Sequence, residues 1–173
     1  MEARPKLALF EEIMLPHLDA AYNLARWLMR NDHDAEDAVQ EAYLRAFRFF
    51  DGFQGGDGKP WLLAVVRNTC LTFRSRENAR EQAPFDDEIH GAGGPLAEAA
   101  VIDSERHGGI RECLETLPTE FRSVLVMREL EEMPYKDIAA VTSLPIGTVM
   151  SRLSRARRRL QDCVTGRMKG VAR

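Results

Sequence analysis

Cysteine and histidine are scarce in this sequence, and neither residue clusters. The 3 cysteines, Cys70, Cys113 and Cys163, are far apart and odd in number, and the 4 histidines are equally scattered. Zinc sites and disulfide frameworks need such residues at paired spacings. The sequence therefore predicts three reduced thiols, no metal site and no cofactor.

Long apolar runs are missing as well. No stretch has the roughly 20 predominantly apolar residues that a membrane-spanning helix needs, and the first residues do not have the pattern of a signal peptide. We therefore expect a soluble, cytoplasmic protein without membrane insertion. Apolar residues nevertheless make up 45% of the 173 residues, enough for the core of one domain or of two small ones.

Charge of one sign is not in large excess, because the net charge is only −3. This value taken alone argues against a nucleic-acid partner, but the two signs are separated along the chain. Acids dominate residues 77–105, whereas Asp162 is the sole acid from Ser151 onward. A basic C-terminal stretch is therefore available for a negatively charged partner.

Residues 134–160 have the pattern of two short helices that meet at a tight turn. Pro134 suits the first position of a helix, where no amide proton is needed, and Ser143-Leu144-Pro145 cannot continue that helix. Apolar residues then recur at steps of three and four, which predicts that one stripe of the second helix faces inward. This stripe consists of Ile146, Val149, Leu153, Ala156 and Leu160. The expected outward face carries Thr148, Ser151, Arg152, Arg155, Arg158 and Arg159.

Such a pair of helices is typical of a helix-turn-helix, which places its second helix in the major groove of DNA. Residues near the start of that helix would meet base edges, and the arginines would meet phosphates. The alternative is an ordinary amphipathic helix whose basic face is solvated. We favour DNA binding, because the turn spacing and the charge agree.

The first part of the chain also has helical periodicity. Apolar residues keep helical spacing over residues 7–30, although Pro16 should kink or break the helix. Asp34 is expected to be the N-cap of the next helix, in which Asp37, Gln40 and Glu41 are exposed. Helix capping is the simple alternative explanation for the acids at this helix start.

A glycine-rich loop, residues 49–60, holds aromatic side chains that a solvated loop does not need. The helix that begins at Pro60 then carries Trp61 and Phe73 among several arginines. Aromatic and basic side chains beside a mobile loop suit single-stranded nucleic acid, because bases stack on the rings and phosphates pair with arginine. For Trp61 and Phe73 taken individually, burial in the core is favoured over a role in binding, because burial is the usual fate of large apolar side chains.

Periodicity fades between about Glu77 and Gly109, where glycine, proline and acids predict a tether. A second helical block starts near Ile110 and supports the helix-turn-helix. The sequence thus predicts an all-α protein of two small helical domains, residues 1–78 and 109–173, joined by an acidic flexible linker, residues 79–108.

Taken together, these features resemble the extracytoplasmic-function (ECF) sigma factors, the compact class of the sigma-70 family. Residues 34–41, Asp-Ala-Glu-Asp-Ala-Val-Gln-Glu, are similar to the core-polymerase-binding motif of that family. The residues similar to its promoter-melting segment are Lys59-Pro60-Trp61-Leu62 and Val66-Arg67-Asn68. Those similar to its fourth region are Leu117-Pro118, Phe121-Arg122 and residues 135–157. The resemblance extends from about Leu7 to Leu160.

The resemblance implies a specificity subunit of RNA polymerase that is not an enzyme and is commonly held by an anti-sigma factor. Asp37, Gln40 and Glu41 would dock on the clamp coiled coil of core polymerase, and the loop would capture a flipped base of the minus-ten promoter element. The residues implied for that element are Asp51, Phe53, Lys59, Trp61, Arg67, Asn68 and Arg74. Those implied for the minus-thirty-five element are Thr148, Ser151, Arg152, Arg155, Arg158 and Arg159. Met150 stands where many relatives carry a basic residue.

Two other classes of function are open to a helix-turn-helix chain. A free-standing transcriptional regulator would carry an N-terminal sensor or dimerisation domain, and a sensor needs a polar-lined pocket. An enzyme would need a Ser-His-Asp arrangement, a phosphate-binding loop or a metal cluster, none of which the sequence offers.

Overall fold

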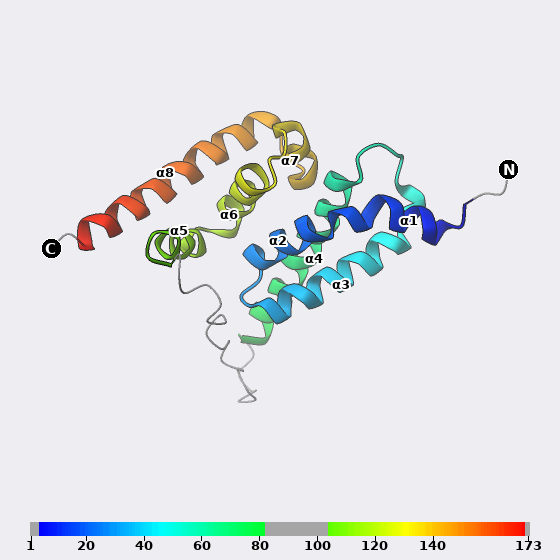
Figure 1. The fold of residues 1–173 in the computed structure, drawn as a ribbon, viewed down its shortest axis with the longest axis horizontal. Helices are drawn as coiled ribbons and strands as arrows, with labels where there is room; N and C mark the ends of the chain where they lie inside the picture. The colour runs from blue at the N-terminus through cyan, green and yellow to red at the C-terminus, as the bar shows by residue number, and fades with distance from the viewer. Residues whose placement is uncertain (1–3, 82–103, 172–173) are drawn as a thin grey trace. The chain divides into compact units, whose positions relative to one another are not determined.

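The computed structural model describes residues 4–81 and 104–171, which are helical and contain no strand (Figure 1). The first half of the chain forms α1 (Lys6–Met14), α2 (Leu18–Leu28), α3 (Asp32–Arg48) and α4 (Gly58–Glu81). The second half forms α5 (Ser104–Thr116), α6 (Thr119–Leu125), α7 (Tyr135–Thr142) and α8 (Ile146–Val171). Two short 3-10 helices, η1 (Leu15–His17) and η2 (Phe50–Gly52), and a π-helix, η4 (Val126–Leu130), interrupt these.

The helices form two compact units, one mainly of α1–α4 and the other mainly of α5–α8. The predicted all-α class with two helical parts is therefore confirmed for the described residues. Most of the predicted linker, residues 79–108, lies outside them. Of that segment the structure describes the end of α4, which continues to Glu81, and the start of α5 at Ser104.

In the first unit α2, α3 and α4 pack against one another, and α1 lies against α4 (Figure 1). Small side chains line much of these contacts, and they allow the helix axes to approach closely. The buried alanines of α2 and α3 are Ala20, Ala21, Ala25, Ala35, Ala38, Ala42 and Ala46. The larger side chains that fill the remaining core include Leu24, Leu28, Leu62, Leu63 and Val66.

Local signals set two of the helix ends in this unit. Pro16 lies in η1 and interrupts the helix between α1 and α2, as predicted. The prediction that Asp34 caps α3 is wrong, because the cap is Asn31, whose side-chain oxygen accepts a hydrogen bond from the Asp34 amide at 2.8 Å. Asp34 lies inside the first turn instead, where its carboxylate accepts a bond from the Asn31 side chain and is favoured by the helix dipole.

The start of α4 is held close to α1. Asp57 caps the helix, since its carboxylate accepts a hydrogen bond from the Lys59 amide at 3.0 Å. The next residue, Gly58, is buried against Ile13 of α1. A Cβ atom on Gly58 would lie 2.7 Å from Cγ2 and 3.3 Å from the carbonyl oxygen of Ile13. The contact between α1 and α4 therefore depends on glycine at position 58.

In the second unit α5 and α6 both pack against α8. Arg122 of α6 joins the end of α5 to this core, because its guanidinium donates hydrogen bonds to the carbonyl oxygens of Leu114 at 3.0 Å and of Glu115 and Leu117 at 2.8 Å. The last carbonyls of a helix have no partner within the helix, so Arg122 stabilises the C-terminal end of α5.

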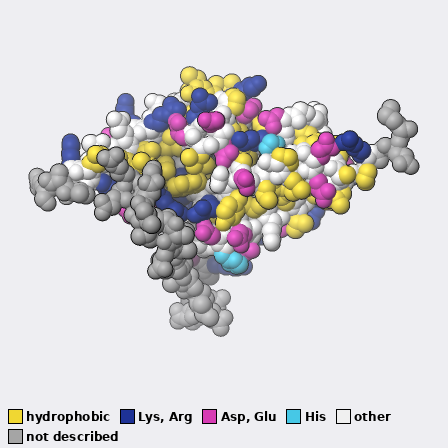
Figure 2. Space-filling model, in the orientation of Figure 1, with side chains coloured by type: hydrophobic (Ala, Val, Ile, Leu, Met, Phe, Trp, Pro, Cys, Tyr) yellow, Lys and Arg dark blue, Asp and Glu magenta, His cyan; other side chains and the backbone are white. Residues whose placement is uncertain are grey.

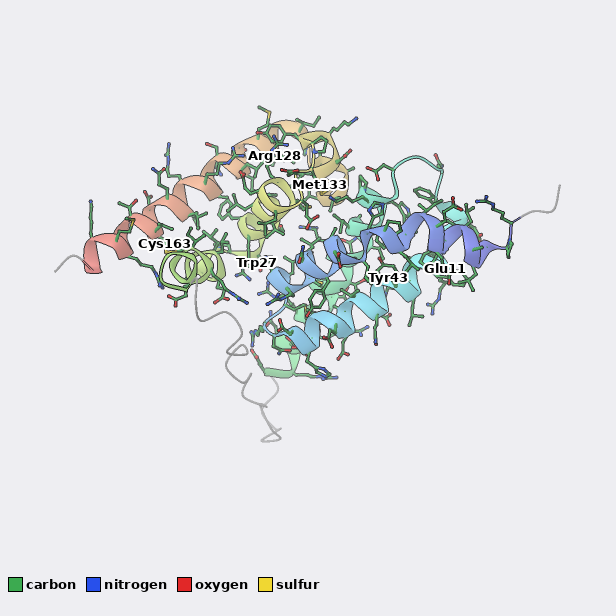
Figure 3. The ribbon with its side chains drawn as sticks, in the orientation of Figure 1. Glu11, Trp27, Tyr43, Arg128, Met133 and Cys163 are labelled. Atoms are coloured by element: carbon green, nitrogen blue, oxygen red, sulfur yellow. A yellow bond between two sulfur atoms is a disulfide. The ribbon has the colours of Figure 1, made fainter. Side chains whose placement is uncertain are left out.

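The prediction of three reduced thiols is wrong for two of them. Cys113 of α5 and Cys163 of α8 form a disulfide across the α5–α8 contact, with their Cα atoms 5.8 Å apart (Figure 3). Cys70 is free, as predicted, and fully buried in α4. Burial raises the pKa of the Cys70 thiol to about 12, so this thiol stays protonated.

None of the helices in the described ranges combines the length and the apolar character that a bilayer crossing requires.

The disulfide should contribute strongly to the stability of the second unit. It links residues 50 positions apart, and the loop-closure relation assigns such a link about 4 kcal/mol of stabilisation. Dithiothreitol should therefore lower the denaturant midpoint of this unit to that of the Cys113→Ser, Cys163→Ser double variant. The double variant should itself be insensitive to dithiothreitol. An unchanged wild-type midpoint on reduction would contradict the expected contribution.

The Gly58→Ala variant should destabilise the first unit, because its Cβ overlaps Ile13. Overpacking of this kind costs about 1–3 kcal/mol, which urea unfolding followed by circular dichroism can measure. Gly52→Ala is the matched control, since a Cβ at position 52 meets no atom within 4 Å. Equal free energies of unfolding for the two variants would show that α1 and α4 can move apart to accommodate the added methyl group without destabilising the unit.

Candidate nucleic-acid and partner interfaces

One face of α3 is acidic and exposed. Asp37 and Gln40 are exposed, as predicted, and Glu41 is half-buried beside Arg45, with which it forms an ion pair of 2.8 Å. Leu44 lies on the same face, since it follows Gln40 by one turn and Asp37 by two, and its exposed fraction is 63%. Leu44 was not among the predicted residues, although its spacing from Asp37 places it on the same helix face.

A cluster of aromatic rings joins the first unit's helices at the glycine-rich loop. Phe10 of α1 makes an edge contact with Phe50 of η2, with ring centroids 5.2 Å apart. Phe50 stacks on Phe53 at 5.7 Å, and Phe53 in turn lies 5.4 Å from the ring of Trp61 in α4. Tyr43 of α3 packs on Phe10 and donates a hydrogen bond to the carbonyl of Met14 at 2.9 Å (Figure 3).

The cluster holds both ends of the loop while leaving Phe53 and Trp61 half-buried. Between them the loop turns at Gly55 and Gly56, which both have φ of +86°, a conformation that favours glycine. Asp51, at the start of the loop, forms an ion pair with Lys6 of α1 at 2.8 Å. Trp61 and Phe73 are both half-buried, so each side chain packs partly into the core and keeps part of its surface exposed.

The predicted residues of α4 lie in two rows along the helix. Trp61 and Asn68 are seven residues apart, or about two turns, and therefore share the face opposite the buried leucines. Arg67 and Arg74 have the same spacing and lie on a neighbouring flank, where both are half-buried. Lys59 is half-buried in the first turn. The structure thus brings Phe53, Trp61 and Asn68 to one side of the first unit.

The helices α7 and α8 form the predicted helix-turn-helix. α7 ends at Thr142, and Ser143 adopts a φ of +56°, the left-handed conformation that often ends a helix. The Leu144 amide donates to the carbonyl of Ala139 at 3.1 Å and closes the turn. α8 then starts at Ile146, with Val149, Leu153 and Ala156 buried on its inner stripe. The prediction that Ile146 belongs to this stripe is wrong, because its side chain is exposed at the start of the helix.

Two arginine contacts hold η4 against the helix-turn-helix. Arg128 donates a hydrogen bond to the carbonyl of Met133 at 2.9 Å and lies over the ring of Tyr135 at 4.8 Å (Figure 3). Arg157 of α8 donates to one carboxylate oxygen of Glu129 through Nε at 3.0 Å and Nη2 at 2.8 Å. The hydrogen bond to Glu129 raises the pKa of Arg157, which remains charged.

The residues predicted for DNA differ in their surroundings along α8. Ser151, Arg155 and Arg158 are exposed, whereas Thr148 and Arg152 are half-buried at the edge of the core. The Arg159 guanidinium lies over the ring of Phe121 at 4.7 Å, so packing on α6 already engages it. Figure 2 shows Lys and Arg side chains projecting along the edge of the second unit where Figure 1 draws α8.

Family comparisons match both units. The family described as "Sigma-70 region 2" matches residues 13–80, and the family described as "Sigma-70, region 4" matches residues 107–160. The first match covers α2, α3, nearly all of α4 and the aromatic cluster except Phe10. The second covers most of α5, all of α6 and α7, and the first part of α8.

Several curated proteins are similar over most of the chain. The ECF RNA polymerase sigma factor SigE of Mycolicibacterium smegmatis is 36% identical over 155 residues, which cover 88% of this chain and 60% of that relative. The chain thus spans less than two thirds of the length of this relative. The ECF RNA polymerase sigma-E factor of Escherichia coli strain K12 is 31% identical over 141 residues, 76% of this chain and 74% of the relative.

A solved structure is also similar. It is the sigma factor RpoE of Bartonella quintana in a co-crystal with the anti-sigma factor NepR, with a TM-score of 0.69 and 28% identity. The match covers 90% of this chain and 96% of that chain.

Proposed function

Because the chain belongs to the ECF class of sigma-70 RNA polymerase sigma factors, we propose that it directs core polymerase to a set of promoters and helps to open them. One observation carries this proposal: both units match sigma family regions, in the order region 2 and then region 4. A free-standing regulator is not favoured, because its sensor or dimerisation domain would have to occupy the part of the chain that matches region 2. In the proposed role the chain supplies specificity and no catalytic groups of its own.

The acidic face of α3 is the proposed docking surface for core polymerase. On this face the exposed Leu44 follows Asp37, Gln40 and Glu41 along the helix. Specific protein interfaces commonly combine apolar and polar side chains in this way. The acidic side chains would suit a basic helical surface on the polymerase and would steer the encounter.

The Asp37→Arg variant should lose affinity for core polymerase by about 2 kcal/mol, or roughly 30-fold, because it places like charges together in the complex. Fluorescence titration of labelled chain with core polymerase measures this loss. Glu11→Arg makes the same charge change at an exposed position of α1 and serves as the control. Normal affinity and normal transcription by Asp37→Arg would refute the docking assignment.

The aromatic cluster with its loop is the proposed site for the minus-ten element. Capture of an extruded base costs a few kcal/mol of unstacking, and stacking on an aromatic ring returns about 1–3 kcal/mol. Phe53 and Trp61 would supply the stacking surface and Asn68 a hydrogen-bonding amide. Arg67, Arg74 and Lys59 would contact phosphates, and Asp51 would hold the loop through Lys6.

α8 is the proposed reader of the minus-thirty-five element. Thr148, Ser151 and Arg152 are closest to the start of the helix, where a docked helix meets base edges. The exposed Arg155 and Arg158 follow at helical spacing and would bind phosphates. Arg159 would contribute less, because its guanidinium is already engaged on Phe121.

Substitution of the exposed Arg158 and substitution of Arg159, which packs on Phe121, should affect DNA binding differently. Arg158→Ala should weaken all DNA sequences alike and lower the slope of log affinity against log salt by about one. Arg159→Ala should change that slope less and should lower the stability of the second unit by about 0.5–1 kcal/mol, the value of an exposed cation–π contact. Promoter-fragment binding at several salt concentrations, with thermal unfolding, compares the two. A changed base preference in Arg158→Ala would show that it reads sequence.

An anti-sigma factor is a proposed partner, supported by the similarity to RpoE of Bartonella quintana, which was crystallised with one. A cytoplasmic location follows from the proposed work on polymerase and promoter DNA. Both proposals rest on the family of the chain.

A further inference from the structure

The first turns of α8 expose two apolar side chains on a helix whose other outward residues are mostly polar. The exposed fractions are 48% for Ile146 and 52% for Met150. These residues are one turn apart, so they share a flank of the helix. Hydrophobic side chains lie beside basic ones at the upper edge of the second unit (Figure 2). Isolated exposed apolar residues are common and need no explanation, so the neighbours of this pair decide its significance.

Those neighbours form a surface that suits the major groove. Gly147 and Ser151 lie next to Met150 on the outward face, and both are exposed. A Cβ atom on Gly147 would meet no atom within 4 Å, so packing inside the protein does not explain the glycine. Small side chains let the helix backbone approach base edges closely, and the exposed Arg155 one turn further on provides the charge that phosphates require.

Met150 has a side chain that can read only one feature of a base edge. Its thioether donates no hydrogen bond and is a weak acceptor, whereas its methyl and methylene groups make apolar contacts. The apolar group in the major groove is the C5-methyl of thymine. Guanine and cytosine at the same place would leave hydrogen-bonding groups without a partner beside an apolar side chain, which is unfavourable.

We propose that Met150, supported by Ile146, is a specificity-determining residue that selects a thymine in the minus-thirty-five element by contact with its C5-methyl group. This inference rests on the proposed function, in which α8 enters the major groove. It adds a base preference that the arginine and hydroxyl side chains of the helix do not supply.

The test uses the full-length chain with core polymerase. A library randomised at the minus-thirty-five element first identifies the thymines that the wild type selects. Each selected thymine is then replaced by deoxyuridine, which lacks only the C5-methyl group, and the affinity ratio of the two promoters is measured. At one position the wild type should bind the deoxyuridine promoter about fourfold more weakly, the effect expected from one buried methyl group.

Three variants make the assignment specific. Met150→Ala should bind the thymine and deoxyuridine promoters equally, and Met150→Leu should keep most of the discrimination because its side chain is still apolar. Met168→Ala, at a position that is 70% exposed near the end of the same helix, should behave like the wild type. Both positions are solvent-accessible in the unbound chain, and thermal unfolding verifies that each of the three variants folds.

Two results would overturn the inference. One is a wild type that selects no thymine, or that binds thymine and deoxyuridine alike. The other is discrimination that persists in Met150→Ala, which would assign the methyl contact to another residue. A holoenzyme with no sequence preference at all would refute the proposed function of α8 and the inference with it, and the library step reveals that result first.

Discussion

Burial of one stripe of α8 determines which of its side chains are exposed for the proposed contact with DNA. Val149, Leu153 and Ala156 are fully or almost fully buried against the rest of the second unit. A buried leucine contributes about 1.5–3 kcal/mol, whereas an exposed ion pair such as Arg157 with Glu129 contributes about 0–1 kcal/mol. The apolar stripe therefore sets the rotation of the helix about its axis, and the ion pair adds to an orientation that already exists. Ser151, Arg155 and Arg158 point outward as a consequence.

In the first unit, packing constrains the start of α4 in a comparable way. Gly58 allows α4 to touch Ile13, and the aromatic rings from Phe10 to Trp61 then close around the ends of the loop. Packing thus fixes the two ends of the loop, and the turn between them consists of glycines, which tolerate many backbone conformations. A rigid frame with an adaptable loop is a suitable arrangement for capturing a base, since only the loop has to be reordered on binding.

Local patterns predicted the elements, whereas contacts between distant residues could not be predicted. The bend at Pro16 and the turn at Ser143-Leu144-Pro145 follow from backbone chemistry, so both were found. The cap of α3 was misplaced because Asn31 and Asp34 are both good capping residues three positions apart, and the structure uses them as donor and acceptor to each other. The disulfide, the contact of Arg159 with Phe121 and the packing of Gly58 all depend on how separate helices meet. Spacing along one helix contains no information about such contacts.

The central claim is that the two units together give core polymerase its choice of promoter. The direct measurement is in vitro transcription by core polymerase with and without the chain on a library randomised upstream of the start site, followed by sequencing of the transcribed templates. We expect transcripts only when the chain is present, from templates that share two sequence blocks, one at minus ten and one at minus thirty-five, at a fixed separation. Transcripts that do not depend on the chain, or transcribed templates that share only one sequence block or none, would contradict the account.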